Sequence, residues 1–142
     1  MSFSSIREML QASQTARQPL YEVILESDLA ESGLTRAESE AEMHRLWAVM
    51  QATSDGYCGA DRSMSGFAGG DAAKVSEAAA RGILYADGYF ADVMAEALKT
   101  AECNACMKRI VAAPTAGSCG VLPAVLLPLA RAGEADEEAI CD

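Results

Sequence analysis

The sequence predicts an all-α fold, an irregular helical domain of about six helices joined by glycine-rich loops. Two observations carry this prediction. Hydrophobic residues make up 51% of the 142 residues and aromatic residues only 6%. Alanine, leucine, methionine and glutamate dominate, and runs of valine and isoleucine are short, a composition that favours helices over sheet. Helix-start and helix-end patterns also recur along the chain, which is long enough for one domain with a modest core.

Three helices are predicted in the first part of the chain. The first is short and opens with the capping box Ser5-Ile6-Arg7-Glu8. The second begins after Pro19, runs from Leu20 to about Ala30 and is closed by Gly33. The third opens with the capping box Thr35-Arg36-Ala37-Glu38 and runs to about Thr53.

The third helix is expected to bury one apolar stripe, formed by Met43, Leu46, Trp47 and Met50. It also carries His44, the single histidine of the chain. No partner for His44 is visible nearby in the sequence, so we interpret it as a surface or semi-buried residue of the helix rather than a catalytic one.

A glycine-rich loop follows, and residues 56–70 hold five of the eleven glycines. Neither a phosphate-binding Gly-Lys-Ser/Thr nor a dinucleotide-binding Gly-x-Gly-x-x-Gly is present. Met64 and Phe67 lie inside the loop and predict that it is packed against the core. Asp71 is expected to cap a helix over 72–81, with Gly82 behind it. The loop is either a structural turn or a ligand loop, and its candidate ligand-binding residues are Ser63, Ser65, Gly66, Gly69, Gly70 and Asp71.

The longest helix is predicted from Asp87 or Gly88 to about Ala112. One face is expected to be buried, and it consists of Tyr89, Phe90, Val93, Met94, Ala97, Leu98 and Ala101. Near its end, Asn104 and Arg109 are polar residues in apolar surroundings and need partners. Asn104 is either a satisfied core amide or a substrate contact.

A turn between two apolar segments is the second candidate site. Pro114 ends an incoming helix, and Pro123 suits the first turn of the next helix, predicted over 121–132. Between the two prolines, Thr115, Gly117 and Ser118 offer hydroxyls and backbone N–H groups at a helix start, which favours an anion such as a carboxylate. The alternative is a satisfied corner between two helices.

The end of the chain predicts one more helix. Gly133 closes the preceding helix, and Asp136 caps a new helix with acidic residues in its first turn. The chain stops within about two turns of that start, too soon to bury a helix face. We therefore expect the 142 residues to be a fragment of a longer protein, truncated at the C-terminus.

Charge and cysteine content limit the possible partners. The net charge is −10, which argues against nucleic acid and anionic membranes as partners. The sequence shows no signal peptide and no uninterrupted apolar span. Five cysteines form no disulfide framework and predict a reducing cytoplasm, with thiols free or metal-bound.

Cys103 and Cys106 have the spacing of many metal and redox sites. Inside a predicted helix they share one face but make only half of a tetrahedral site, so two buried apolar cysteines are the simpler interpretation. Two alternatives to an enzyme stay open, a small metal or redox module built on this pair and a structural interaction domain.

Several motifs together resemble the iron–sulfur-dependent L-serine dehydratases (L-serine ammonia-lyases), more narrowly the alpha chain of the two-subunit form. Residues 112–123, Ala-Ala-Pro-Thr-Ala-Gly-Ser-Cys-Gly-Val-Leu-Pro, resemble the family's signature. Residues 63–72 resemble Ser-x-Ser-Gly-Leu-x-Gly-Gly-Asp-Ala, and residues 102–111 resemble Glu-x-Asn-Ala-x-Met-Gly-Arg-Ile-Val. Runs around Glu22–Glu26 and Glu31–Gly33 are similar too, so the resemblance covers nearly the whole chain. Lys108 departs from the pattern, which usually has glycine there.

The resemblance implies an all-helical catalytic domain with a [4Fe–4S] cluster, one iron of which acts on the serine hydroxyl as a Lewis acid. The family's cluster cysteines sit in later motifs that would lie beyond Asp142, so no metal ligand is expected among residues 1–142. The implied reaction converts L-serine to pyruvate and ammonia, in amino-acid catabolism and gluconeogenesis. The implied partners are the rest of the alpha chain and a beta chain.

These implications lead to four expectations for the chain. Residues 1–142 are the N-terminal part of the alpha-chain catalytic domain and are inactive alone. Uncovered apolar helix faces favour self-association. The loops 63–71 and 114–120 meet at the substrate and shape its carboxylate site. No residue is assigned as the general base.

Overall fold

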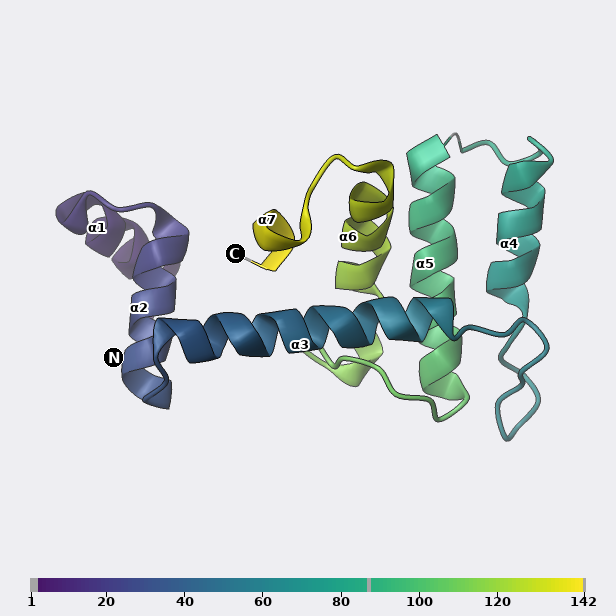
Figure 1. Cartoon of the computed structure of the whole chain (residues 1–142), viewed down its shortest axis with the longest axis horizontal. Coiled ribbons are helices and arrows are strands. Elements are labelled where there is room, and N and C mark those ends of the chain that lie inside the picture. Colours follow the sequence, from purple (N-terminus) through teal and green to yellow (C-terminus); the bar gives the residue numbers. More distant parts are fainter. Residues whose placement is uncertain (1–2, 87, 142) are drawn as a thin grey trace. The chain divides into compact units, whose positions relative to one another are not determined.

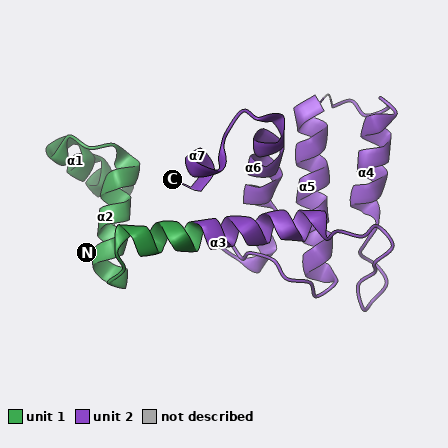
Figure 2. Cartoon of the chain, viewed as in Figure 1, with its two compact units in different colours: residues 1–43 green, residues 44–142 purple. Residues whose placement is uncertain are grey.

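A computed structural model describes residues 3–86 and 88–141. These residues form seven α-helices and one short 3-10 turn, with no strand among them (Figure 1). The all-α prediction is therefore confirmed. The chain divides into two compact units, residues 1–43 and residues 44–142 (Figure 2). None of the described helices combines the length and hydropathy needed to cross a bilayer.

Unit 1 contains α1 (Ile6–Ala16), α2 (Leu20–Ser32) and the first part of α3 (Arg36–Asp55). Ser5 caps α1 as predicted, since its Oγ accepts from Glu8 N at 3.3 Å. The reciprocal bond differs from the predicted capping box, because the Glu8 carboxylate accepts from Ser4 N at 2.8 Å. Gly33 closes α2 with φ 73°, which confirms the predicted end.

The start of α3 confirms a second local prediction. Thr35 N donates to Glu38 Oε2 at 2.8 Å, and Glu38 N donates to Thr35 Oγ1 at 3.3 Å. This is the reciprocal capping box, which satisfies donors that the first helical turn leaves free.

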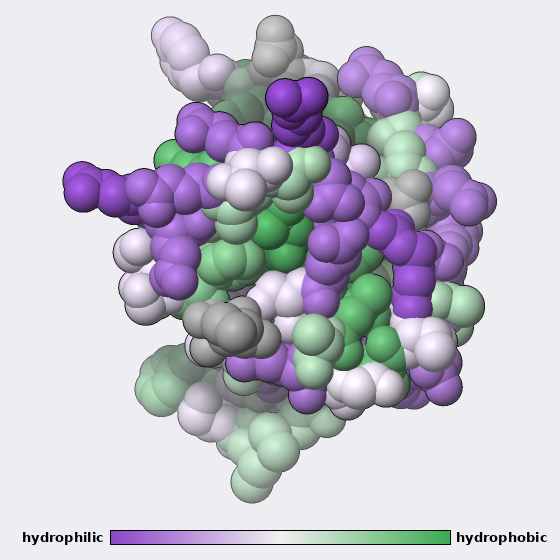
Figure 3. All heavy atoms as spheres, turned by 90° about the vertical axis from the view of Figure 1, so that its left-hand side faces the viewer, coloured by the Kyte–Doolittle hydropathy of each residue, from purple (hydrophilic) through white to green (hydrophobic). Residues whose placement is uncertain are grey.

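Hydrophobic side chains reach the surface in several places between polar ones, as the green patches of Figure 3 show.

Unit 2 contains the rest of α3 together with α4 (Asp71–Ala80), α5 (Gly88–Ala105), α6 (Val121–Ala132) and α7 (Glu137–Cys141). In Figure 1, α5 stands between α4 and α6, and it packs against both. A core cluster joins α3 to α6, α7 and the segment after α5, and its buried members are Trp47, Met50, Val111, Leu127 and Cys141.

The predicted stripe of α3 is confirmed in part. Trp47 and Met50 are buried and Leu46 is partly buried. Met43 is 43% exposed, so its predicted burial is wrong. His44 is partly buried, which fits the predicted surface or semi-buried position, but it has a partner, because its Nδ1 is 3.1 Å from Glu137 Oε1.

Helix α5 ends earlier than predicted. It stops at Ala105 rather than Ala112, because Met107 adopts the left-handed conformation with φ 60°. Met107 N donates to Asn104 O at 3.0 Å and Lys108 N donates to Cys103 O at 2.9 Å. This pair of bonds is a Schellman cap, a helix ending that usually has glycine in place of Met107. The longest helix is α3, with 20 residues against 18 in α5. Asp87, the other predicted start, lies outside the described residues.

The predicted buried face of α5 is wrong for Tyr89, Phe90, Met94 and Ala101, which are exposed, while Val93, Ala97 and Leu98 are partly buried. Tyr89 and Phe90 are 43% and 61% exposed. The buried residues are small or polar, namely Ala91, Ala95, Glu96, Thr100, Glu102 and Cys103. Small residues let the neighbouring helices approach closely, and both buried glutamates have partners on other elements. Hydrophobic periodicity could not find this face, because it counts carboxylates as solvent-facing.

The last helices follow the local signals. Gly133 closes α6 with φ 72°, and Asp136 caps α7, because its Oδ1 accepts from Ala139 N at 2.8 Å. At the start of α6, Gly120 lies against α5, where an added Cβ would be 2.9 Å from Ala97 O. Glycine is therefore required at this approach of the two helices.

Candidate functional site

The base of the 63–71 loop is held by a buried glutamate of α5. Glu102 is 7% exposed. Its Oε1 accepts from Asp71 N at 2.6 Å and Ala72 N at 3.2 Å. Its Oε2 accepts from Gly70 N at 2.9 Å and from the Tyr57 hydroxyl at 2.6 Å. One carboxylate thus satisfies three successive N–H groups at the start of α4, where the helix dipole also favours negative charge.

These contacts change the acidity of both side chains. Burial alone would raise the pKa of Glu102, but hydrogen bonds from Tyr57 and from the N–H groups of Asp71, Gly70 and Ala72 outweigh it and lower the pKa. Burial, together with the hydrogen bond to Glu102, raises the pKa of Tyr57 to about 12. The pair is therefore a phenol that donates to an ionised carboxylate at neutral pH.

The predicted cap residue of α4 is wrong. Asp71 is the first residue of the helix, and its side chain accepts from Lys74 Nζ at 2.7 Å instead of capping. The hydrogen bond to Lys74 lowers the pKa of Asp71. Glu102 supplies the cap from 31 residues away, an interaction that no local pattern contains.

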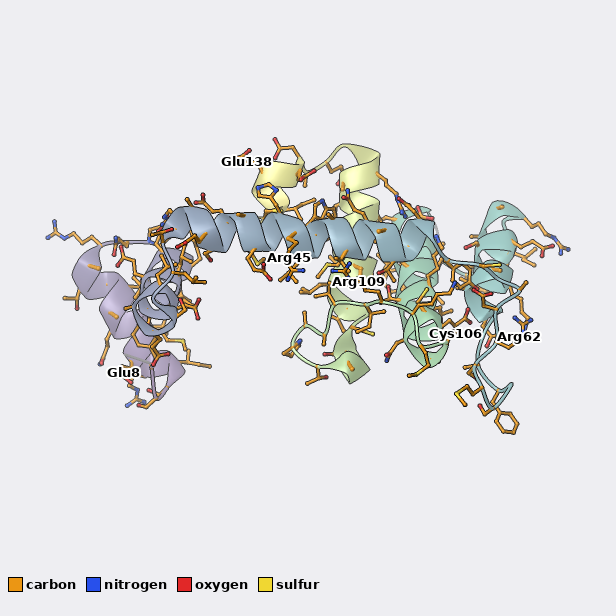
Figure 4. The ribbon with its side chains drawn as sticks, turned by 60° about the horizontal axis from the view of Figure 1, so that its bottom comes forward. Glu8, Arg45, Arg62, Cys106, Arg109 and Glu138 are labelled. Atoms are coloured by element: carbon orange, nitrogen blue, oxygen red, sulfur yellow. The ribbon has the colours of Figure 1, made fainter. Side chains whose placement is uncertain are left out.

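Two glycines of this loop adopt a positive φ that residues with a Cβ rarely take, and space also requires the first of them. A Cβ on Gly69 would lie 2.2 Å from Asp61 O, and φ there is 128°. A Cβ on Gly70 would lie 3.0 Å from the Arg62 guanidinium nitrogens, and φ there is 87°. Arg62, labelled in Figure 4, donates to Gly59 O at 2.8 Å and closes the turn from the other side. The Gly-Gly pair therefore serves close packing of the loop base.

The outer part of the loop is exposed. Met64 and Phe67 are each 96% exposed, so the predicted packing of this loop against the core is wrong. The loop bonds to itself instead, with Ser63 N donating to Ala68 O at 2.9 Å and Ala68 N donating to Ser63 Oγ at 3.2 Å. The hydroxyls of Ser63 and Ser65 lie 3.1 Å apart. Ser65 and Gly66 are exposed, whereas Ser63 is partly buried and its hydroxyl bonds within the loop.

The 114–120 loop forms a second, separate group. Thr115 and Ser118 cap the 3-10 turn Ala116–Ser118, with Thr115 N donating to Ser118 Oγ at 3.2 Å and their hydroxyls 3.1 Å apart. Asn104 is partly buried and donates its side-chain N–H to Ala116 O at 3.2 Å. Asn104, Gly117 and Ser118 line a hollow of about 260 Å³ with small residues of α5 and α6.

Both loops are attached to the last turn of α5. Glu102 holds the 63–71 loop and Asn104 holds the 114–120 loop. Residues two apart on a helix point about 200° apart around its axis, so the two loops attach on opposite sides of α5. The candidate residues thus form two groups, one in each loop. That the two loops meet at one substrate stays a prediction.

The cysteines do not fit an iron–sulfur cluster in the described part of the chain. Within residues 3–86 and 88–141, no three His, Cys, Asp or Glu side chains are grouped to hold a metal ion. Cys103 donates its S–H to Thr53 O at 3.7 Å, and burial raises the pKa of its thiol. Burial raises the pKa of Cys119 as well. A cluster needs accessible thiolates, which these two buried thiols do not supply.

Sequence reasoning missed several polar residues that organise the two loops and their helices. Tyr57 and Glu102 hold the base of the 63–71 loop. A second buried glutamate, Glu96, binds Arg131 of α6 at 2.5 Å. Lys108, which departs from the family pattern, pairs with Asp61 and donates to Gly56 O at 3.3 Å. The signal that could have found the two glutamates was the presence of charged residues within α5, which is otherwise largely apolar. Arg109 was expected among buried residues, but it is exposed.

Comparison with known proteins gives a consistent match. A family model described as "Serine dehydratase alpha chain" matches residues 5–142. The chain is 31% identical over 125 residues to the L-serine dehydratase alpha chain of Peptoniphilus asaccharolyticus, covering 87% of this chain and 43% of that protein. It is 27% identical over 124 residues to a probable L-serine dehydratase alpha chain of Bacillus subtilis (strain 168), covering 87% and 41%. The chain thus spans about two fifths of the length of these relatives. No solved structure matches it.

Proposed function

The chain belongs to the serine dehydratase alpha-chain family, and on that premise we propose that it takes part in the conversion of L-serine to pyruvate and ammonia. The observation that carries the proposal is the family match over residues 5–142, which includes both loops and the turn of α5 that holds them. Because the chain spans about two fifths of its relatives, activity is proposed for an assembly with further alpha-chain polypeptide and a beta chain. We place this assembly in the cytoplasm.

The proposed reaction is an elimination followed by hydrolysis. The α-proton and the β-hydroxyl leave L-serine as water, the enamine product becomes an imine, and water then releases ammonia and pyruvate. A [4Fe–4S] cluster, if held by residues other than those described, would supply Lewis-acid chemistry at the hydroxyl. The cysteines described here do not fit that group, so no step is assigned to it.

The described residues are proposed to bind and orient the substrate. Hydroxyls and backbone N–H groups suit a carboxylate, because each donates a charge-assisted hydrogen bond. In the 63–71 loop, Ser65 is exposed and its hydroxyl offers such a donor, while the Ser63 hydroxyl accepts from Ala68 N and lies 3.1 Å from that of Ser65. Asn104, Gly117 and Ser118 offer them around the hollow of the 114–120 loop. Orientation of a small substrate by such groups supplies part of the rate enhancement.

Two substitutions test this proposal in the complete enzyme. Ser65→Ala and Ser118→Ala should each lower kcat/KM for L-serine more than tenfold, measured as pyruvate formation without oxygen. Thr15→Ala is a matched control, because its hydroxyl is exposed on α1 and bonds only within that helix. Near-normal kcat/KM in both serine variants would refute the assignment of these loops.

Neither alternative function has a supporting observation of equal weight. A metal or redox module built on Cys103 and Cys106 would need reactive thiols, and burial raises the pKa of Cys103. A structural interaction domain would use the exposed apolar side chains of α5, such as Phe90 at 61% exposed. Self-association through such side chains stays a prediction and is compatible with the enzymatic role.

A further inference from the structure

A buried carboxylate with four hydrogen-bond donors is an uncommon use of a glutamate, and the proposed reaction does not by itself require it. Glu102 lies near the end of α5, yet every donor that it meets comes from elsewhere in the chain. Tyr57 donates from the segment after α3, and Gly70, Asp71 and Ala72 donate from the start of α4. The Tyr57 hydroxyl in turn accepts from Ala73 N at 3.3 Å. The carboxylate therefore ties together three segments.

The three N–H groups form the kind of cradle that would otherwise bind an external anion. Successive backbone donors at a helix start favour a carboxylate or phosphate. Here a side chain of the same protein already fills the cradle at hydrogen-bond distance. A substrate carboxylate would have to displace a buried, ionised group that keeps four bonds, so this half of the loop is not available to it.

We propose that Glu102 is a positioning residue: it fixes the Gly70–Ala72 end of the 63–71 loop to α5 and leaves only the exposed part of the loop, around Ser65 and Gly66, to contact L-serine. The contact with L-serine rests on the proposed function. The attachment of the loop to α5 through Glu102 does not depend on any activity. It also divides the family motif by role, with Ser65 exposed, Ser63 bonded within the loop, and Gly69, Gly70 and Asp71 serving the attachment.

The attachment explains how one helix turn can set the geometry of both loops. Glu102 and Asn104 are two residues apart on α5 and hold loops on opposite sides of it. Loss of the Glu102 contact would therefore let the 63–71 loop move relative to a 114–120 loop that stays in place. Small displacements of binding groups reduce catalysis strongly, because orientation supplies much of the rate.

Amide hydrogen exchange of the unmodified 142-residue chain is the first test. The first N–H groups of a helix have no intrahelical acceptor and normally exchange fast. If Glu102 accepts from them, Gly70, Asp71 and Ala72 should exchange at least tenfold more slowly than Val121 and Leu122, measured as protection relative to intrinsic rates. Those two residues start α6, whose cap residue Gly120 offers no side chain. Equal exchange in both groups would overturn the proposal.

Substitutions then separate the local effect from general destabilisation. Glu102→Gln should accelerate exchange of the Gly70–Ala72 amides at least tenfold more than exchange in the middle of α5. Glu96→Gln is the matched control, because Glu96 is also buried on α5 but contacts Lys99, Ser54 and Arg131 rather than α4. Glu96→Gln should leave unchanged the ratio of the Gly70–Ala72 exchange rates to the exchange rates in the middle of α5. Equal exchange ratios in Glu102→Gln and Glu96→Gln would overturn the local role of Glu102. If Glu102→Gln does not fold, Tyr57→Phe replaces it as the test variant. It removes one of the four donors to Glu102, so its exchange ratio should lie between that of the unmodified chain and the tenfold change expected for Glu102→Gln.

Kinetics in the complete enzyme test the positioning role. Glu102→Gln should raise KM for L-serine more than tenfold, and Glu96→Gln should change KM and kcat less than threefold. Glu102→Asp keeps the charge and should recover part of the loss. Unchanged KM and kcat in an active Glu102→Gln enzyme would overturn the role. If the unmodified enzyme does not act on L-serine, the proposed function fails, while the exchange result still decides whether Glu102 holds the loop.

Discussion

Replacement of Arg131 by methionine is expected to lower the free energy of unfolding by about 2 kcal/mol, through the buried carboxylate of Glu96. Arg131 lies in the last turn of α6 and its guanidinium donates to three groups. These are Glu96 Oε1 at 2.5 Å, Ser54 Oγ at 3.0 Å and Asp55 Oδ1 at 3.1 Å. Methionine keeps an apolar side chain at this position and removes all three hydrogen bonds.

The magnitude follows from the burial of each partner. Glu96 is 3% exposed, so water cannot replace the lost donor, and a hydrogen bond to such a charged group contributes about 1.5–3 kcal/mol. We expect the lower part of that range, because Lys99 still donates at 2.7 Å and the Arg131 side chain is itself 45% exposed. Asp55 is 73% exposed, and a pair of that kind adds only about 0–1 kcal/mol.

The effect should depend on pH in a defined direction. Burial alone would raise the pKa of Glu96, but hydrogen bonds from Lys99, Ser54 and Arg131 outweigh it and hold the pKa below its usual value of 4.5. A carboxyl with a lower pKa in the folded state contributes stability above the unfolded pKa and loses it as pH falls through the folded pKa. The difference between the two proteins should therefore be complete at pH 7 and shrink below about pH 4.5.

Urea unfolding followed by tryptophan fluorescence measures this prediction. Trp47 is the single tryptophan and is 3% exposed in the core of unit 2, the unit that contains Arg131. Arg81→Met is the matched control, because Arg81 pairs with Glu77 at 3.6 Å on the surface of α4, where the side chains are 64% and 71% exposed. The reasoning is refuted if both variants change the free energy of unfolding by the same amount, below about 0.5 kcal/mol.

Three further substitutions and one chemical modification have defined outcomes. Gly69→Ala should destabilise the fold by more than about 2 kcal/mol in urea unfolding, because its Cβ would lie 2.2 Å from a backbone oxygen. Gly66→Ala should cost only about 1 kcal/mol, since φ is 77° but nothing lies within 4 Å; similar costs would contradict the steric argument. Met107→Gly should stabilise by about 1 kcal/mol in the same measurement, because glycine adopts φ 60° without strain; an unchanged or lowered stability would contradict it. Iodoacetamide at pH 8 should alkylate exposed Cys58 at least about tenfold faster than buried Cys103, whose thiol pKa is raised, as read by peptide mass spectrometry; equal rates would show that the site opens readily.

Several features of the fold could be predicted because their causes are local. The caps at Ser5 and Thr35 and the helix end at Gly33 each involve residues within four positions of one another. Backbone geometry alone decides such contacts, whatever the rest of the chain does. The end of α5 is the exception among local features, because Met107 adopts a conformation that residues with a Cβ rarely take.

The candidate loops were also visible in the sequence, but their roles were not. Serine and glycine spacing identified Ser63, Ser65 and the 114–120 loop as offering hydroxyls and N–H groups. It could not show that Met64 and Phe67 would be exposed, because the loop satisfies its own backbone and needs no cover from a helix. Nor could it separate the exposed Ser65 from the glycines that serve packing.

By itself, the sequence determined the helical class, most helix boundaries and the family to which the chain belongs. Only the tertiary structure decided which face of α5 is buried and what holds the two loops. Glu96 meets Arg131 35 residues away, and Glu102 caps a helix that starts 31 residues earlier. The physical reason is that a carboxylate is buried only where distant segments together supply enough donors to replace water. That supply depends on how the helices pack, and no local pattern of residues encodes it.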